Sequence, residues 1–234
     1  MTDTPRLKLP AIEAAQAQKH VTHNEALALL DAFVQLVVES RNMAAPPGSP
    51  AEGDTYIVAA SATGAWSGWD LMLAVYSGGA WIKLVPPAGA KAFVKDERAT
   101  VTYSDGVWRD GVALTAHGGR LTLRAKEEEL TLTGAFVETA DSAFIPNRAI
   151  VLGVASRTTL AITGATSYGV GVSGEVGKFG NLLGNALNST NIGVIGPTAY
   201  YADTKVRVTA NGTNFTAGKV RVIVYFLEMV APTD

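Results

Sequence analysis

The chain has 234 residues and carries few charges for its length. Only 17% of its residues are Asp, Glu, Lys or Arg, against roughly 25% in an average soluble domain, while 47% are hydrophobic and 24 are glycine. We expect the surface of a protein with this composition either to be buried in an assembly or to be polar and uncharged. The formal net charge of −2 gives no electrostatic indication of nucleic acid or an anionic membrane as partner. Cysteine is absent, which excludes disulfides and thiolate metal sites.

Residues 1–41 are predicted to form an extended arm followed by two helices. The stretch 11–20 is rich in Ala, Glu and Gln and predicts the first helix. Thr22 and Glu25 match a T-x-x-E capping box, which predicts the start of a second helix that runs to about Ser40. Apolar residues recur in this helix at helical spacing: Ala26, Leu29, Leu30, Phe33 and Val37. The last four are the candidate oligomerisation or attachment residues; the alternative is packing against the β part of the same chain.

Residues 42–52 are predicted to be a linker, because this stretch is rich in proline and glycine. Residues 53–111 are predicted to form a small antiparallel β domain, since short apolar segments alternate there with Gly- and Pro-containing turns. All tryptophans of the chain fall in this range: Trp66, Trp69, Trp81 and Trp108.

Residues 112–234 are predicted to form a C-terminal jelly-roll-like β-sandwich, with turn residues at intervals of roughly 8–12 positions. The segment 219–229 is apolar on both faces in its centre, which is typical of a central strand. The acidic run 127–129 is interpreted as a hairpin tip, and the Gly/Asn-rich stretch 174–191 as a long functional or intersubunit loop. The predicted fold class is mainly β, with a short N-terminal helical segment, a small antiparallel β unit and this sandwich.

The sequence offers little material for catalysis. Gly169, Gly171 and Gly174 match G-x-G-x-x-G, but no helical pattern follows, so turns and close strand packing explain these glycines better than a dinucleotide does. His20 and His23 are three residues apart, yet no third metal ligand is evident. With three histidines in all, a Ser-His-Asp triad is also disfavoured. We therefore expect that the chain is not an enzyme and that it binds neither a cofactor nor a metal ion.

Aromatic residues in turn-rich segments are the best candidates for ligand binding. Sugar rings lay their apolar faces on Trp or Tyr side chains, and binding platforms are commonly built on loops. The candidate glycan-binding residues on this basis are Trp66, Trp69, Tyr200 and Tyr201. Core packing or subunit contact is the commoner fate of such residues.

Three segments resemble a domain of formerly unknown function in alphaproteobacterial prophages and gene transfer agents. They are AAQAQKHVTHNEAL at 14–27, APPGSPAEGDTYIVAASATGAW at 45–66 and DGVW at 105–108. The resemblance covers residues 9 to about 110, and the carboxyl half looks like the β domain that commonly follows. It implies a virion appendage, namely a head spike, head fibre or tail fibre. It identifies no sugar-contacting residue.

The expected function is a structural and adhesive component of a phage-like particle that aids adsorption to cell-surface polysaccharide. The expected partners are further copies of the chain (a trimer, or a pentamer at a fivefold vertex), a capsid or tail protein, a second spike or fibre protein, and the polysaccharide. Neither nucleic acid nor a membrane is expected. The chain is expected on the particle surface, after synthesis in a bacterial cytoplasm without a signal peptide.

Two alternatives remain open. One is a purely structural base or adaptor that joins the particle to a separate receptor-binding protein, with the segment 174–191 buried between chains. The other is a polysaccharide-degrading spike, which would require an acidic cluster in a groove.

Overall fold

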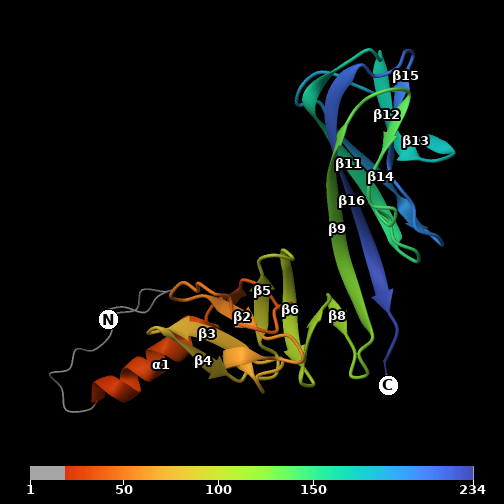
Figure 1. The fold of residues 1–234 in the computed structure, drawn as a ribbon. Helices are drawn as coiled ribbons and strands as arrows, with labels where there is room; N and C mark the ends of the chain where they lie inside the picture. Colours follow the sequence, from red (N-terminus) through yellow and green to blue (C-terminus); the bar gives the residue numbers. More distant parts are fainter. Residues whose placement is uncertain (1–18, 234) are drawn as a thin grey trace. The chain divides into compact units, whose positions relative to one another are not determined.

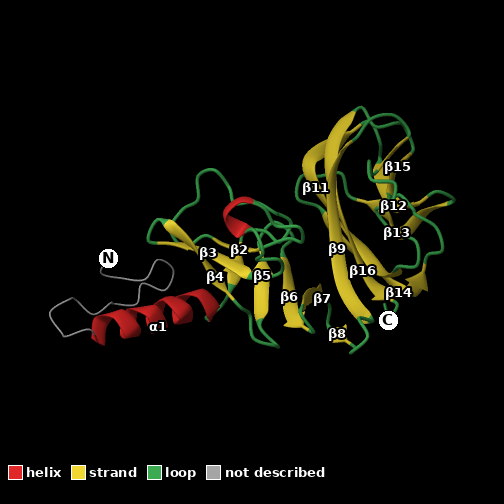
Figure 2. Cartoon of the chain, turned by 60° about the horizontal axis from the view of Figure 1, so that its bottom comes forward, coloured by secondary structure: helices red, strands yellow, loops and turns green. Residues whose placement is uncertain are grey.

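The computed structural model describes residues 19–233 and confirms a mainly β fold with one short N-terminal helix (Figure 2). The chain divides into two compact units, residues 1–111 and 112–234. The predicted first helix falls almost entirely on residues 1–18, which lie outside the described part.

The first unit combines one α-helix with two small sheets. Its helices are α1 (Lys19–Phe33) and the short 3-10 helix η1 (Gly64–Trp66). One sheet has the order β1-β5-β6-β7, with β1 (Val37–Val38), β5 (Lys91–Val94), β6 (Ala99–Ser104) and β7 (Val107–Asp110). The other has the order β2-β3-β4, with β2 (Thr55–Ile57), β3 (Leu73–Ser77) and β4 (Ala80–Leu84).

The predicted helix from residue 23 to residue 40 has both ends wrong. Helix α1 already includes Lys19 and continues through Thr22, so no cap separates two helices there. The helix ends at Phe33, and Gln35 takes a left-handed backbone with φ of 48°, which helical geometry does not allow. Val37 therefore lies on strand β1, not on the helical stripe, and pairs in parallel with Phe93.

Strand β1 belongs to the core of the first unit. Leu36 and Val38 are buried, and they pack in one cluster with Val94, Val101 and Trp108. β-Branched valines favour a half-buried strand over a helix end. Burial of the side chains around position 37 therefore prevails over the local helical periodicity.

The second unit is built from nine strands in two sheets. The strands are β8 (Ala113–Leu114), β9 (Arg120–Thr131), β10 (Phe136–Glu138), β11 (Ile150–Thr163), β12 (Ser167–Val172), β13 (Glu175–Leu183), β14 (Thr190–Ala199), β15 (Arg207–Asn211) and β16 (Ala217–Val230). The long-strand sheet has the order β14-β11-β16-β9-β8, and the short-strand sheet has the order β10-β15-β12-β13 (Figure 1).

The strand order is that of a jelly roll. Apart from β8, the strands pair like one long hairpin folded on itself: β9 with β16, β10 with β15, β11 with β14 and β12 with β13, all antiparallel. The hairpin is then wrapped so that β16 also pairs with β11, and β15 with β12. This nested arrangement of two Greek keys defines the jelly-roll fold. The jelly-roll prediction is thereby confirmed.

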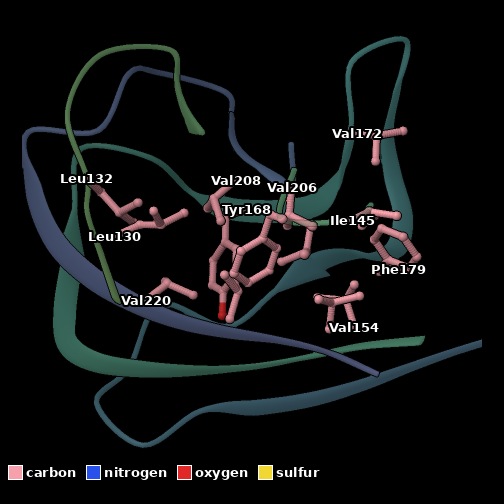
Figure 3. Packing of buried hydrophobic residues seen from close by; sticks show 14 of the residues in the cluster. Leu130, Leu132, Ile145, Val154, Tyr168, Val172, Phe179, Val206, Val208 and Val220 are labelled. Carbon is pink, nitrogen blue, oxygen red and sulfur yellow. The ribbon is translucent and has the colours of Figure 1, made fainter. Parts of the chain in front are cut away.

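The core of the second unit lies between its two sheets (Figure 3). Along β16, alternate residues are fully buried: Val220, Val222, Val224 and Phe226. Tyr168 and Val208 of the short-strand sheet pack in the same cluster with Val154 and Phe179. The alternation of apolar residues with a period of two therefore determines which side chains of each strand face the core.

Two sequence-based interpretations in this unit are wrong. Residues 127–129 are not a hairpin tip, because they lie within β9, which pairs residue by residue with β16 from Arg120 to Thr131. Residues 174–191 are not one loop, because they contain all of β13 and the start of β14. Strand β9 is formed with a partner distant in the sequence, and β13 pairs with the preceding strand β12 in an irregular register, so local composition reveals neither pairing.

Candidate assembly and binding surface

The outer face of the long-strand sheet is apolar over its centre. On β16, the residues that alternate with the buried ones face outward, and they include Ile223, Tyr225 and Leu227. Side chains of the neighbouring strands continue this surface, with Ile192 80%, Val194 76% and Leu123 55% exposed. We define the apolar face as Leu123, Ile192, Val194, Ile223, Tyr225 and Leu227.

The outer face of the short-strand sheet is more polar, and its exposed Phe136 lies under the guanidinium of Arg207. Arg207 donates from Nε and Nη2 to Oε1 of Glu138, at 2.9 and 2.6 Å. Nδ2 of Asn211 donates to Ser167 and to Asn181, both at 3.0 Å. A solvated antiparallel sheet normally has such a polar outer face, so the apolar face on the other sheet is the exception within this sandwich.

Charged residues lie at one end of the apolar face. Arg157 on β11 is directly opposite Arg221 on β16, and like charges in this position repel each other. Glu129 offsets the repulsion by accepting hydrogen bonds from Lys219 at 3.1 Å and from Arg221 at 3.0 Å. Arg157 donates to the amide oxygen of Asn188 at 2.7 Å. This end therefore carries both signs of charge on rigid strands.

Two adjoining hollows mark this face. The larger has a volume of about 380 Å³, and its lining combines charged, amide and apolar side chains: Glu127, Arg157, Asn191, Ile192, Arg221 and Ile223. The smaller has a volume of about 240 Å³, is almost wholly apolar, and includes Tyr225 and Val194 in its lining. A hollow with a few polar groups over an apolar floor suits binding of a polar ligand with apolar patches.

Glu129, beside the larger hollow, is poorly suited to acid catalysis. The hydrogen bond from Lys219 is the largest of the effects that hold the pKa of Glu129 below its usual range. A general acid for glycoside hydrolysis needs the opposite, a carboxyl whose pKa is raised. Glu129 therefore acts as a counter-charge for its basic neighbours.

The four predicted glycan-binding residues are divided between the two units of the chain. Trp69 belongs to the first unit, where it is half-buried against an aromatic cluster, whereas Tyr200 and Tyr201 belong to the second. Tyr201 is 82% exposed. Tyr200 packs against the core, and its ring lies 5.5 Å from Nζ of Lys178. Burial is the main cause of the raised pKa of Tyr200.

The prediction for Trp66 is wrong. Its side chain is fully buried, with its ring centre 5.0 Å from that of Trp81 and 5.4 Å from that of Tyr56. Packing of large aromatic rings excludes water from this cluster, so Trp66 has no ring face to offer a sugar.

The predicted attachment residues lie in the first unit and have different environments. Leu29 and Leu30 on α1 are 46% and 52% exposed, so both remain available to a partner. Phe33 is half-buried and packs against the core cluster that contains Leu36. Val37 lies on β1, as described above. Of the four predicted attachment residues, Leu29 and Leu30 are therefore the exposed candidates on the helix.

The residues of the larger hollow escaped the sequence analysis. The signal was present in segment 219–229, where apolar residues occupy the outward positions as well as the inward ones. That pattern was interpreted as a central strand, and β16 does lie between β11 and β9 in the sheet. The structure shows a strand with sheet neighbours on both sides but only one covered face.

Within the described residues there is no cluster of three or more His, Asp or Glu side chains that could hold a metal ion. Among the same residues, no helix has both the length and the apolar character that crossing a bilayer requires.

Comparisons with known proteins give a family match over part of the chain and a distant structural similarity. Residues 23–109 match the model of a family described as "Protein of unknown function (DUF2793)". No curated protein matches the chain. A chain of the solved "Cyanophage Pam1 capsid asymmetric unit" is 21% identical, with a TM-score of 0.35, over 54% of this chain and 96% of that chain. A similarity this distant carries no argument about function.

Proposed function

We propose that the chain is a structural and adhesive subunit of a phage-like particle, in a head spike, head fibre or tail fibre. The apolar face carries this proposal, because the two outer faces of one sandwich differ so sharply. An extended exposed apolar surface on a soluble domain marks a site that another molecule covers. Jelly rolls form viral capsid and lectin domains, so the fold is compatible with this role without establishing it. The resemblance of residues 9–110 to prophage proteins adds the particle context.

The adhesive part of the proposal rests on the larger hollow. Its volume of about 380 Å³ lies within the range of small-ligand sites. Arg157 and Arg221 present donors that sugar hydroxyls and carboxylates accept. Tyr225 in the neighbouring hollow supplies an aromatic surface. A cell-surface polysaccharide segment is the ligand that this combination fits best.

A purely structural base or adaptor is the second candidate. Its supporting observation is the exposure of apolar side chains between residues 174 and 191, where Leu182 is 76% and Leu187 55% exposed. These side chains lie outside the apolar face. Their burial against another protein of the particle would leave adhesion to a separate chain.

The proposal is tested on particles purified from a host that produces them. Strains carry the wild-type chain, the helix variant Leu29→Lys/Leu30→Lys, the hollow variant Arg157→Ala/Arg221→Ala, or the control Lys91→Ala, which removes an exposed charge of the first unit. Mass spectrometry measures the amount of the chain in the particles, and adsorption is compared on encapsulated and capsule-free cells.

We expect the helix variant to be depleted from particles, because the two lysines place charges on its apolar attachment surface. The hollow variant should remain on the particles and lose at least tenfold in adsorption to encapsulated cells. Wild-type particles that lack the chain would refute the virion role. Particles that carry the hollow variant and adsorb normally would refute adhesion and leave the adaptor.

A further inference from the structure

Strand β14 forms an unprotected margin of the apolar face. Among the described strands it pairs only with β11, so its other side is a free edge of the long-strand sheet (Figure 1). Its ten residues, TNIGVIGPTA, include no charged side chain. Soluble proteins normally protect such edges with charges, prolines or bulges. Pro197 comes only after the exposed Ile192 and Val194, so the apolar part of the edge is left without this protection.

The size of the apolar face argues against a simple face-to-face dimer. The outward row from Ile223 to Met229 spans about 20 Å, and the four strands from β14 to β9 span about 14 Å, from standard strand dimensions. Their product is on the order of 300 Å² of flat area, whereas a stable interface buries about 800 Å² on each partner. A contact between the edge of one copy and the face of another gives each chain two contact zones. The area that each chain buries then comes closer to that of a stable interface.

The chemistry of both zones favours a second copy over another partner. The free edge is apolar and uncharged, and the face it would meet is apolar as well. The only charges lie at the end of the face, where Arg157 and Arg221 occur beside Glu127. Because both signs are present there, the surface offers no complement to a strongly acidic or basic protein.

We propose that the β14 edge of one copy packs on the apolar face of the next copy at the side where Leu123 lies opposite Leu227, head to tail around a symmetry axis. The larger hollow at the charged end stays open to a ligand. Each chain then gives its edge to one neighbour and receives the edge of the other. Contacts of this heterologous type close into rings when the rotation allows it. The inference rests on the proposed function and deepens it, because it describes how the subunits of the particle assemble. It is nevertheless tested on the purified chain alone.

The test uses light scattering on the full chain and on three variants. Val194→Lys charges the edge, and Leu123→Lys charges the far side of the face, on β9. Leu182→Lys is the matched control, because it introduces the same charge at an equally exposed apolar residue elsewhere in the second unit. Circular dichroism checks that every variant is folded, which we expect because all three side chains are mostly exposed.

We expect the wild-type chain and Leu182→Lys to form one closed oligomer, with a mass that is a multiple of 24.4 kDa, and a trimer is the expected form. Val194→Lys and Leu123→Lys should each be monomeric. A 1:1 mixture of these two should give a heterodimer, because the intact β14 edge of Leu123→Lys meets the unchanged Leu123 and Leu227 of Val194→Lys. A monomeric wild-type chain would overturn the inference. The inference would also fail if Leu182→Lys were monomeric while Val194→Lys still formed the oligomer.

The outcomes separate this inference from the proposed function. If the chain forms a ring in solution but is absent from purified particles, the edge-to-face contact is supported and the virion role is overturned. A chain present on particles but monomeric when pure would do the reverse.

Discussion

The carbonyl oxygen of Glu175 leaves no room for a side chain at Gly171, since a Cβ at that position would overlap it. Gly169 is confined in the same way by the carbonyl oxygen of Val176. Strand β13 bulges at this point, because its register with β12 shifts between Val170 and Val172. The G-x-G-x-x-G pattern thus records the close approach of β13 to β12.

Gly171→Ala should lower the free energy of unfolding by at least about 1–3 kcal/mol, because the backbone of β13 must move to admit the methyl group. Urea unfolding of the full chain measures the loss. Gly196→Ala is the control, since nothing lies within 4 Å of a Cβ there and its φ is not left-handed. Equal midpoints for the two variants would contradict this account of the motif.

Asp141 should make the stability of the second unit depend on acid pH. The hydrogen bond from Lys126, at 2.8 Å, is the largest of the effects that lower the pKa of Asp141 in the folded chain. A carboxyl with a lowered folded pKa stabilises the protein above its unfolded pKa of about 3.9, and this contribution is lost as the pH falls through the folded pKa.

We therefore expect thermal unfolding between pH 6 and pH 2 to show a steeper acid decline for the wild-type chain than for Asp141→Asn. The difference should be small, because the pair is exposed, and high salt should reduce it. Parallel curves for the two proteins at low salt would show that the ion pair adds nothing.

Trp66 should act as a core residue of the first unit. Trp66→Ala removes a fully buried ring and should cost about 3–5 kcal/mol. Tyr201→Ala, at a position 82% exposed, should change stability by less than about 0.5 kcal/mol. Thermal melts of both variants give the comparison. A stable Trp66→Ala chain would show that the aromatic cluster is dispensable for folding.

Removing residues 1–41 should unfold the first unit as well as remove the helix. Leu36 and Val38 are buried in its core, and strand β1 completes one sheet. Limited proteolysis of the truncated chain should therefore degrade residues 42–111 and spare the jelly roll. The double substitution of Leu29 and Leu30 by lysine should leave both units resistant. Resistance of the truncated chain would show that β1 is not needed.

The amino-acid pattern alone was enough to predict the mainly β fold and the jelly-roll type of the second unit. Alternation with a period of two, turn residues at regular intervals and tryptophan-rich hairpins are local features, and local features encode which residues face a core. The same reasoning disfavoured a nucleotide site at Gly169, Gly171 and Gly174.

Only the tertiary structure decided where helix α1 ends, that residues 127–129 lie inside a strand and that β13 is a strand at all. The first two depend on partners distant in the sequence, β5 for Val37 and β16 for the acidic run. Strand β13 pairs with its hairpin neighbour β12 in an irregular register, which hides the strand behind a Gly- and Asn-rich composition. The structure also decided that the outward side chains of β16 are not covered by the other sheet of the second unit. A sequence shows that a residue is apolar, but the position of the other sheet determines which apolar residues the fold leaves exposed.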